Sequence, residues 1–327
     1  MKINIYKQFV LLCLLSSVFL LLSSAPAEAQ QVNLSLDPPL VNAKIKPGKS
    51  IIVAYTVQNN GDPTNLQFLI RPFVPQGQLG SLSLLPQFEG PILFNLENAD
   101  IALEKPFFFP SKEKRQAVVR ITIPHGIPDG DYYYSVLAET VPAFSVAGQS
   151  TGIASAAIGS PLLITITESG LTEVKATIDE FMFTPDYIFT VGNNTVRIVD
   201  NAKELPILLT VRNEGRNLIQ PRGTVTSQYG RDKKIFSIIP QNILSKSKRL
   251  IKVFSNSENG SANSTVNLTH LSIGSHRVAL ELSYGDDSAI EYKSLSFVAL
   301  PIRLLTVLGI LLGGVILAFI IRYFKKR

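Results

Sequence analysis

The chain has 327 residues, of which 46% are hydrophobic and 17% are charged, and its formal net charge is +6. Seven basic residues and one acidic residue lie in or beside the apolar stretches at the two chain ends; without them, 24 basic and 24 acidic residues remain. The part between these stretches is therefore neutral, which excludes the basic surface of a nucleic-acid-binding protein.

The first 29 residues have the pattern of a signal peptide. Two lysines precede an apolar run from Phe9 to Leu22, and Ala27-Glu28-Ala29 follows as a small-x-small cleavage site. The alternative is that this segment is a second membrane anchor. The short apolar run and the cleavage site that follows it favour the signal peptide. We expect the mature chain to begin at Gln30.

Cysteine usage indicates the compartment and the class of organism. Cys13, inside the predicted signal peptide, is the only cysteine, so the mature chain has neither disulfides nor thiol chemistry. Extracellular eukaryotic domains usually contain disulfides. The sequence therefore favours a bacterial or archaeal surface protein.

The segment from Gln30 to Leu300 has the periodicity of β-strands. In Ser50–Val57 every second residue is apolar, and Asn59-Asn60-Gly61-Asp62 follows as a turn. No run of ten or more residues in this segment has a convincing 3.6-residue period. An all-β fold is predicted, and about 270 residues suffice for two domains at the usual domain size.

An internal repeat supports two similar domains. Three sequence landmarks occur twice in the same order: Thr56–Gly61 with Thr210–Gly215, Ser111–Arg115 with Ser245–Arg249, and Ile127–Tyr132 with Leu271–His276. We predict tandem copies of one immunoglobulin- or fibronectin-like β-sandwich. Two unrelated β domains with similar turns are the alternative.

The landmarks define the predicted domain boundaries. The first sandwich is residues 30–168, with a long insert at 75–110, and the second is residues 169–299. A transmembrane helix at 300–322 and a basic cytoplasmic tail at 323–327 follow. Ser255–Thr269, rich in asparagine and serine, is expected to be a solvated loop.

The third landmark resembles a tyrosine corner, in which a tyrosine hydroxyl bonds back to the backbone. Gly130 and Tyr132 occupy this position in the first copy, and Gly274 corresponds to Gly130 in the second. If the hydroxyl is buried and paired, we expect Tyr132→Phe to cost about 1 kcal/mol of stability or more. Tyr133→Phe, with its side chain on the opposite face, is expected to matter less.

The sequence predicts no catalytic, cofactor-binding or metal-binding residues. His270 and His276 lack a third ligand and are expected at the surface or at a strand edge. Asp129 and Asp131 could share a cation, but flanking a glycine they are typical of a tight turn. No hydrolase or nucleotide motif occurs, so a protein that is not an enzyme and needs no cofactor is predicted.

Leu304–Ile321 is uncharged, and four of the six residues after it are basic. This pattern predicts a single-pass anchor in the cell membrane, with the N-terminus outside and the C-terminus cytoplasmic. Gly309 and Gly313 form a Gly-x-x-x-Gly pair, which offers a face for helix–helix contact.

The layout resembles the WxL-interacting protein family of Gram-positive surfaces. The resemblance is carried by Lys46-Pro47-Gly48-Lys49, Thr56–Gly61, Ile123-Pro124 with Gly130-Asp131-Tyr132, Leu209–Gly215 and Gly274. It implies a first domain that binds peptidoglycan and a second that contacts partner proteins. The insert at Pro75–Pro110 departs from the family pattern.

The leading hypothesis is a membrane-anchored scaffold that presents two sandwiches to a cell-wall polymer or a surface protein. A chaperone that offers a strand edge to other β proteins is the first alternative, and it predicts an unpaired edge strand beside an apolar pocket. An enzyme with an unrecognised site is the second. The sequence identifies neither ligand-binding residues nor the oligomeric state.

Overall fold

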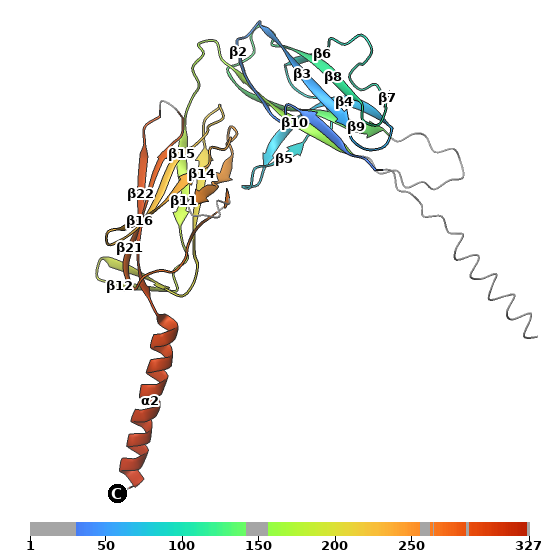
Figure 1. Ribbon diagram of the computed structural model, residues 1–327. Helices are drawn as coiled ribbons and strands as arrows, with labels where there is room; N and C mark the ends of the chain where they lie inside the picture. The colour runs from blue at the N-terminus through green and yellow to red at the C-terminus, as the bar shows by residue number, and fades with distance from the viewer. Residues whose placement is uncertain (1–30, 142–155, 256–261, 264, 286–287, 326–327) are drawn as a thin grey trace, which may run out of the picture.

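The computed structural model describes residues 31–141, 156–255, 262–263, 265–285 and 288–325. They form two β-sandwiches in succession, and helix α2 (Ile302–Lys325) leaves the second (Figure 1). The predicted all-β fold with a C-terminal helix is confirmed. The predicted signal peptide lies outside the described residues.

Two sheets form the first sandwich. One has the order β1-β3-β8-β6, and the other has the order β2-β10-β9-β4-β5, with β7 paired to β4. The chain passes from the first sheet to the second at Pro38-Pro39, since proline cannot donate to a β ladder. The strands are β1 (Leu34–Asp37), β2 (Val41–Ile45), β3 (Ser50–Asn59), β4 (Thr64–Gln76), β5 (Ser81–Leu84), β6 (Leu93–Leu96), β7 (Phe107–Phe109), β8 (Lys114–Thr122), β9 (Gly130–Val141) and β10 (Ala157–Ile166).

The second sandwich repeats this plan. One sheet has the order β11-β14-β17 with β20 beside β14, and the other runs β12-β13-β22-β21-β15-β16-β18-β19. Its last strand, β22, pairs in parallel with β13, as β10 does with β2. The strands are β11 (Ala176–Met182), β12 (Tyr187–Val191), β13 (Asn194–Asp200), β14 (Leu205–Asn213), β15 (Arg222–Tyr229), β16 (Asp232–Ile238), β17 (Lys248–Leu250), β18 (Val253–Ser255), β19 (Ala262–Asn263), β20 (Val266–Leu268), β21 (Gly274–Ser283) and β22 (Glu291–Leu300).

Each sandwich has its own hydrophobic core. The alternation in β3 buries Tyr55 and Val57, and that in β14 buries Ile207, Leu209 and Val211. Side chains on one face of each sheet are thus removed from water between two sheets, which stabilises the fold by about 25 cal/mol per Å² of apolar surface.

The repeated sequence makes the same hydrogen bonds in both sandwiches. The side-chain amide of Asn59 donates to three backbone carbonyls at 2.8–3.3 Å, and that of Asn213 donates to three others at 2.8–3.1 Å. Each asparagine also accepts from the N–H of the glycine two residues on, Gly61 or Gly215. Both landmarks therefore connect the end of one strand to the loop before another.

Strands occur in the long insert and in the predicted loop. The insert Pro75–Pro110 holds β5, β6 and β7, and β4 extends into it as far as Gln76. The expectation of a solvated loop at Ser255–Thr269 is wrong for β20, because Val266 and Leu268 are buried in the second core. Their short alternation was concealed by the surrounding asparagines and serines.

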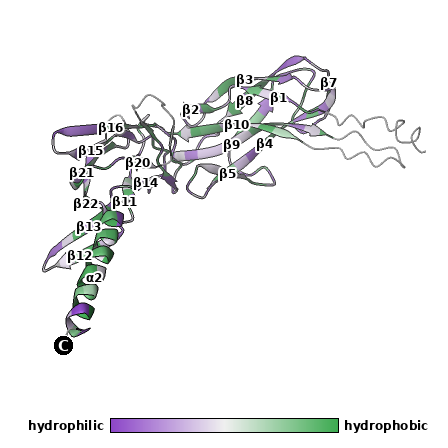
Figure 2. Ribbon diagram, turned by 60° about the horizontal axis from the view of Figure 1, so that its bottom comes forward, coloured by the Kyte–Doolittle hydropathy of each residue, from purple (hydrophilic) through white to green (hydrophobic). Residues whose placement is uncertain are grey.

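Helix α2 is long and apolar enough to cross a membrane, and none of it is buried against the sandwiches. Its 24 residues span about 36 Å at 1.5 Å per residue. Figure 2 shows apolar residues along most of its length. Cβ atoms added at Gly309 and Gly313 would meet no atom within 4 Å, so the surface at this pair is uncovered.

Candidate functional site

The two sandwiches meet at Asp131, near the start of β9. One carboxylate oxygen accepts from the Thr165 hydroxyl at 2.8 Å and from the Asn217 side-chain amide at 2.9 Å. The other accepts from the Tyr133 hydroxyl at 2.9 Å and from the backbone N–H of Leu218. The donors come from both sandwiches, so this single carboxylate connects them.

Tyr133 adds a second connection across the same joint. Its hydroxyl accepts from the backbone N–H of Ser245 at 2.8 Å, and its ring stacks on Phe73 with centroids 5.7 Å apart. Burial is the main reason that the pKa of its phenol is raised, and the nearby Asp131 carboxylate raises it further. An apolar cluster surrounds these groups and contains Phe73, Leu163 and Leu244, with Tyr133 and Leu218 against it.

The turn between β4 and β5 forms a third contact between the sandwiches. The backbone N–H of Leu250 donates to the Gln78 carbonyl at 2.8 Å. Gly80 has a φ of +85°, and a Cβ there would lie 2.3 Å from Nη2 of Arg249. The guanidinium therefore packs directly on the glycine backbone, at a position that L side chains rarely adopt.

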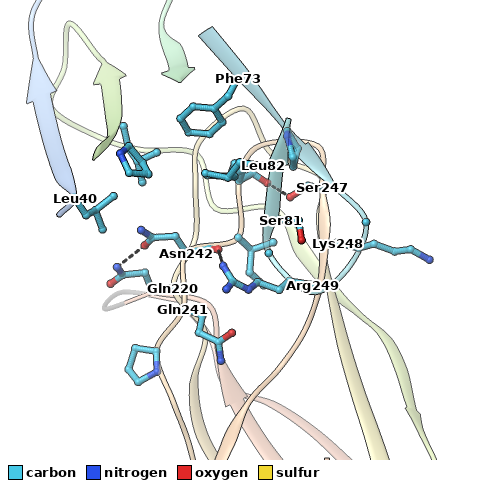
Figure 3. Close-up of a pocket in the computed structure, with 18 residues that line it drawn as sticks. Leu40, Phe73, Ser81, Leu82, Gln220, Gln241, Asn242, Ser247, Lys248 and Arg249 are labelled. Carbon is cyan, nitrogen blue, oxygen red and sulfur yellow. Dashed lines mark hydrogen bonds between the residues drawn. The ribbon is translucent and has the colours of Figure 1, made fainter. Parts of the chain in front are cut away.

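A cavity of about 380 Å³ lies between these contacts. The first sandwich contributes apolar side chains, including Leu40, Phe73 and Leu82, and the second contributes Gln220 and other polar residues. Figure 3 shows Phe73 at the top of the space and Gln220, Gln241 and Arg249 below it. The remaining lining residues are Pro75, Gly77, Gly80, Ser81, Pro161, Leu163, Pro240, Gln241, Asn242, Ile243, Leu244, Ser247, Lys248 and Arg249.

Arg249 is the cationic group that the cavity holds without a counter-ion. Its Nη1 donates to the Asn242 carbonyl at 2.8 Å, whereas its Nε is buried and has no partner. None of the ion pairs among the described residues includes it, while neighbouring Lys248 pairs with Asp179 at 3.5 Å. Burial lowers the pKa of the guanidinium, because no anion compensates for the lost hydration.

A buried acceptor lies in the same wall. Oε1 of Gln241 has no partner, although the amide nitrogen of this side chain donates to the Ile239 carbonyl at 3.4 Å. Gln220 and Asn242 bond to each other at 2.6 Å and so hold their side chains in place. Two residues that line the cavity thus carry a buried donor and a buried acceptor without partners, and apolar side chains line it too, a composition suited to a small polar group with an apolar portion.

The structure places the predicted corner residues at the start of β9 and β21. The Tyr132 hydroxyl donates to the Pro128 carbonyl at 3.2 Å in an exposed position. Gly130 and Gly274 both have positive φ, 153° and 133°. In the second copy, His276 replaces the tyrosine and bonds to Ser272 at 2.7 Å, also four residues upstream.

The expectation that His276 lies at the surface or at a strand edge is wrong, because β21 has a paired strand on each side. Its ring is buried between Tyr229 and Phe297, with centroids 4.7 and 5.1 Å away. The imidazole therefore packs between two aromatic rings and bonds to one backbone oxygen, which is the environment of a structural core residue. The described residues contain no group of three His, Cys, Asp or Glu side chains that could hold a metal.

A second cavity, of about 560 Å³, lies beside β6, an edge strand of the first sandwich. Its lining is mainly apolar and includes Ile70, Phe88, Leu93 and Leu103, with Arg120 among the polar groups. Leu93 is 59% exposed. The insert therefore provides an open strand edge next to an apolar hollow.

Sequence reasoning missed the residues that form the joint and the cavity between the sandwiches. Asp131 was interpreted as a turn residue, and Tyr133 as the less important tyrosine. Arg249 belongs to a repeated landmark, Ser-Lys-x-Lys-Arg, whose first copy ends in Arg115. Arg115 pairs with Glu113 at 2.7 Å, so the absence of an acidic residue two positions before Arg249 was the available signal.

No protein-family model matches the chain, and comparison with curated proteins gave no match. Similar solved structures include a class 5 fimbriae chaperone, CfaA, at 12% identity and a TM-score of 0.36, covering 82% of this chain and 100% of that one. The chaperone YadV has 12% identity and a TM-score of 0.34, covering 81% and 99%. The Salmonella enterica SafA pilin in complex with the SafB chaperone has 12% identity and a TM-score of 0.33, and the match covers 82% of this chain and 98% of that one. Likeness at these TM-scores supports no inference about function.

Proposed function

We propose that this protein is a membrane-anchored binding protein of the prokaryotic cell surface, with its ligand site in the cavity between the two sandwiches. The observation that carries the proposal is the buried, unpartnered Nε of Arg249 in a cavity with an apolar opposite wall. A partly buried cation without a counter-ion loses hydration that nothing replaces, so a ligand that supplies an anion gains affinity from it.

The cavity suits a peptide segment that ends in a carboxylate. The carboxylate would accept from Arg249, an amide N–H would donate to Gln241, and small apolar side chains would cover Leu40 and Leu82. Stem peptides of a cell-wall polymer and C-terminal segments of surface proteins both have this chemistry. The proposal assigns binding and no catalysis to the site.

Anchoring of the site at the membrane is the second part of the proposal. The last strand, β22, ends at Leu300 and α2 begins at Ile302, so the helix follows the second sandwich almost directly. With the basic tail in the cytoplasm, both sandwiches would lie outside the cell. The joint at Asp131 would then hold the first sandwich in a fixed relation to the second.

The test is binding of short peptides with free or amidated C-termini to the full chain in detergent micelles, measured by calorimetry. A free carboxylate is expected to bind better, and Arg249→Gln is expected to weaken binding about 10- to 100-fold, the equivalent of one charge-assisted hydrogen bond. Arg277→Gln, at an exposed position on β21, serves as the matched control. Equal affinity for free and amidated peptides would exclude anion recognition here.

A second function is favoured by the edge strand β6 and its apolar cavity, because an open edge with adjacent pockets can accept a strand from another β protein. In this role the chain would act as a chaperone-like assembly factor. Leu93→Glu is then expected to abolish crosslinking to partner β proteins in membranes, whereas Arg249→Gln leaves it unchanged. The reverse pattern would assign the partner to the cavity between the sandwiches.

A further inference from the structure

The hairpin of β12 and β13 stands away from the rest of the second sandwich. Among the described residues, only Ile198–Asp200 of β13 pair with β22, so no further described strand lies beside Asn194–Arg197 and their partners on β12. A two-stranded ribbon of this kind is marginal in water without something to cover its apolar face.

One face of this ribbon is apolar. Tyr187 lies opposite Ile198, and Phe189 lies opposite Val196, so these side chains share a face. The two aromatic rings stack with centroids 6.4 Å apart. Tyr187 is 50% exposed, Phe189 53% and Val196 39%. The other face carries Ile188 together with two threonines and an arginine.

The base of the hairpin is fixed to the start of α2. Asp200 lies opposite Leu300, and the N–H of Asn201 donates to the Leu300 carbonyl at 3.0 Å. The Asp200 carboxylate, in a residue that is only 3% exposed, pairs with Nε of Arg303 on the helix at 3.2 Å. Figures 1 and 2 both show the hairpin beside the beginning of the helix.

We infer that the apolar face of this hairpin, formed by Tyr187, Phe189 and Val196, contacts the lipid interface of the membrane that α2 crosses. This inference rests on the anchoring in the proposed function. Tyrosine and other aromatic rings favour the headgroup level of a bilayer, which is the level where α2 begins. The seven residues of β13 reach about 23 Å from the anchor, so the contact would fix the tilt of the second sandwich on the membrane.

The experiment uses the absence of tryptophan from the chain. The full chain with Phe189→Trp is reconstituted into phosphatidylcholine vesicles with and without brominated acyl chains, and tryptophan emission is recorded. Val315→Trp, within α2, reports insertion of the anchor. Tyr292→Trp is the control for water exposure, because this residue is 66% exposed and lies eight residues before the end of β22.

We expect Phe189→Trp to show blue-shifted emission that brominated lipid quenches, as for Val315→Trp, and Tyr292→Trp to remain unquenched. Quenching of Val315→Trp alone would overturn the hairpin contact and leave the anchor intact. Failure of Val315→Trp to be quenched would refute the anchor itself. Blue-shifted but unquenched Phe189→Trp would mean that a second copy covers the face, which also overturns the inference.

Two further tryptophan variants test which face of the hairpin contacts lipid. Val196→Trp lies on the same face as Phe189 and is expected to be quenched equally, whereas Ile188→Trp, on the other face, is expected to be quenched less. Equal quenching of Val196→Trp and Ile188→Trp would overturn the assignment of the lipid-facing side. Circular dichroism of each variant establishes that the β fold is retained.

Discussion

Replacing Tyr133 by phenylalanine is expected to destabilise the protein more than the same change at Tyr132. The Tyr133 hydroxyl donates to the carboxylate of Asp131 and accepts from the backbone of Ser245, and both bonds are partly buried at the joint. Losing a bond to a charged group and leaving an N–H unpaired costs about 2 to 3 kcal/mol. The Tyr132 hydroxyl makes one exposed bond at 3.2 Å, worth less than about 1 kcal/mol.

The measurement is urea unfolding of the full chain in detergent micelles, followed by circular dichroism. A difference of about 1.4 kcal/mol between the two variants corresponds to a tenfold change in the folding equilibrium. A double-mutant cycle of Tyr133→Phe with Asp131→Asn should show a non-zero coupling energy, because the two groups share a hydrogen bond. Equal destabilisation by both tyrosine variants, with no coupling, would refute the structural role of the joint.

The raised pKa of Tyr133 adds a dependence on pH. Burial and the nearby Asp131 carboxylate keep the phenol protonated in the folded chain, whereas in the unfolded chain it ionises near pH 10. Its contribution is therefore complete below about pH 10 and is lost as the pH rises beyond that value, by about 1.4 kcal/mol per pH unit. Tyr133→Phe should show a shallower loss of stability in alkali, and an unchanged slope would contradict the burial of this phenol.

Three further changes test the contacts described above. Gly80→Ala should weaken the contact between the sandwiches more than Gly77→Ala, because both glycines have positive φ but only Gly80 lies against Arg249. Limited proteolysis between the sandwiches measures the difference, and equal cleavage of the two variants would contradict the packing of Arg249 on Gly80. Asn213→Asp should cost about 2 to 4 kcal/mol in urea unfolding, because a carboxylate would face three carbonyls, and a neutral result would exclude these bonds. Gly313→Ile should abolish self-association of α2 in a membrane reporter, whereas Leu311→Ile should leave it intact; equal association of both variants and the parent would show that this face makes no helix contact.

Periodicity and turn residues by themselves determined the β architecture. Alternating apolar residues in Ser50–Val57 require one buried face, and that requirement holds whatever the sheet packs against. The repeated Asn-x-Gly sequences indicated two similar units because part of each asparagine's role is local: its side-chain oxygen accepts from the glycine N–H two residues on. Its amide bonds to carbonyls 30 to 51 positions away were not evident from the sequence. The C-terminal helix was also evident from the local sequence, because a long uncharged apolar segment is unfavourable in water.

The site required tertiary structure, because its residues act across long separations in the chain. Asp131 and Asn217 are 86 positions apart, and only the packing of two sandwiches brings them within 2.9 Å. A turn-forming aspartate and one that connects two domains have the same local sequence, so a local pattern cannot distinguish them. Arg249 likewise resembles Arg115 until the fold buries its Nε beside Gly80, where no carboxylate among the described residues pairs with it. Burial and long-range pairing decide the chemistry of such groups, and neither is encoded in a local pattern.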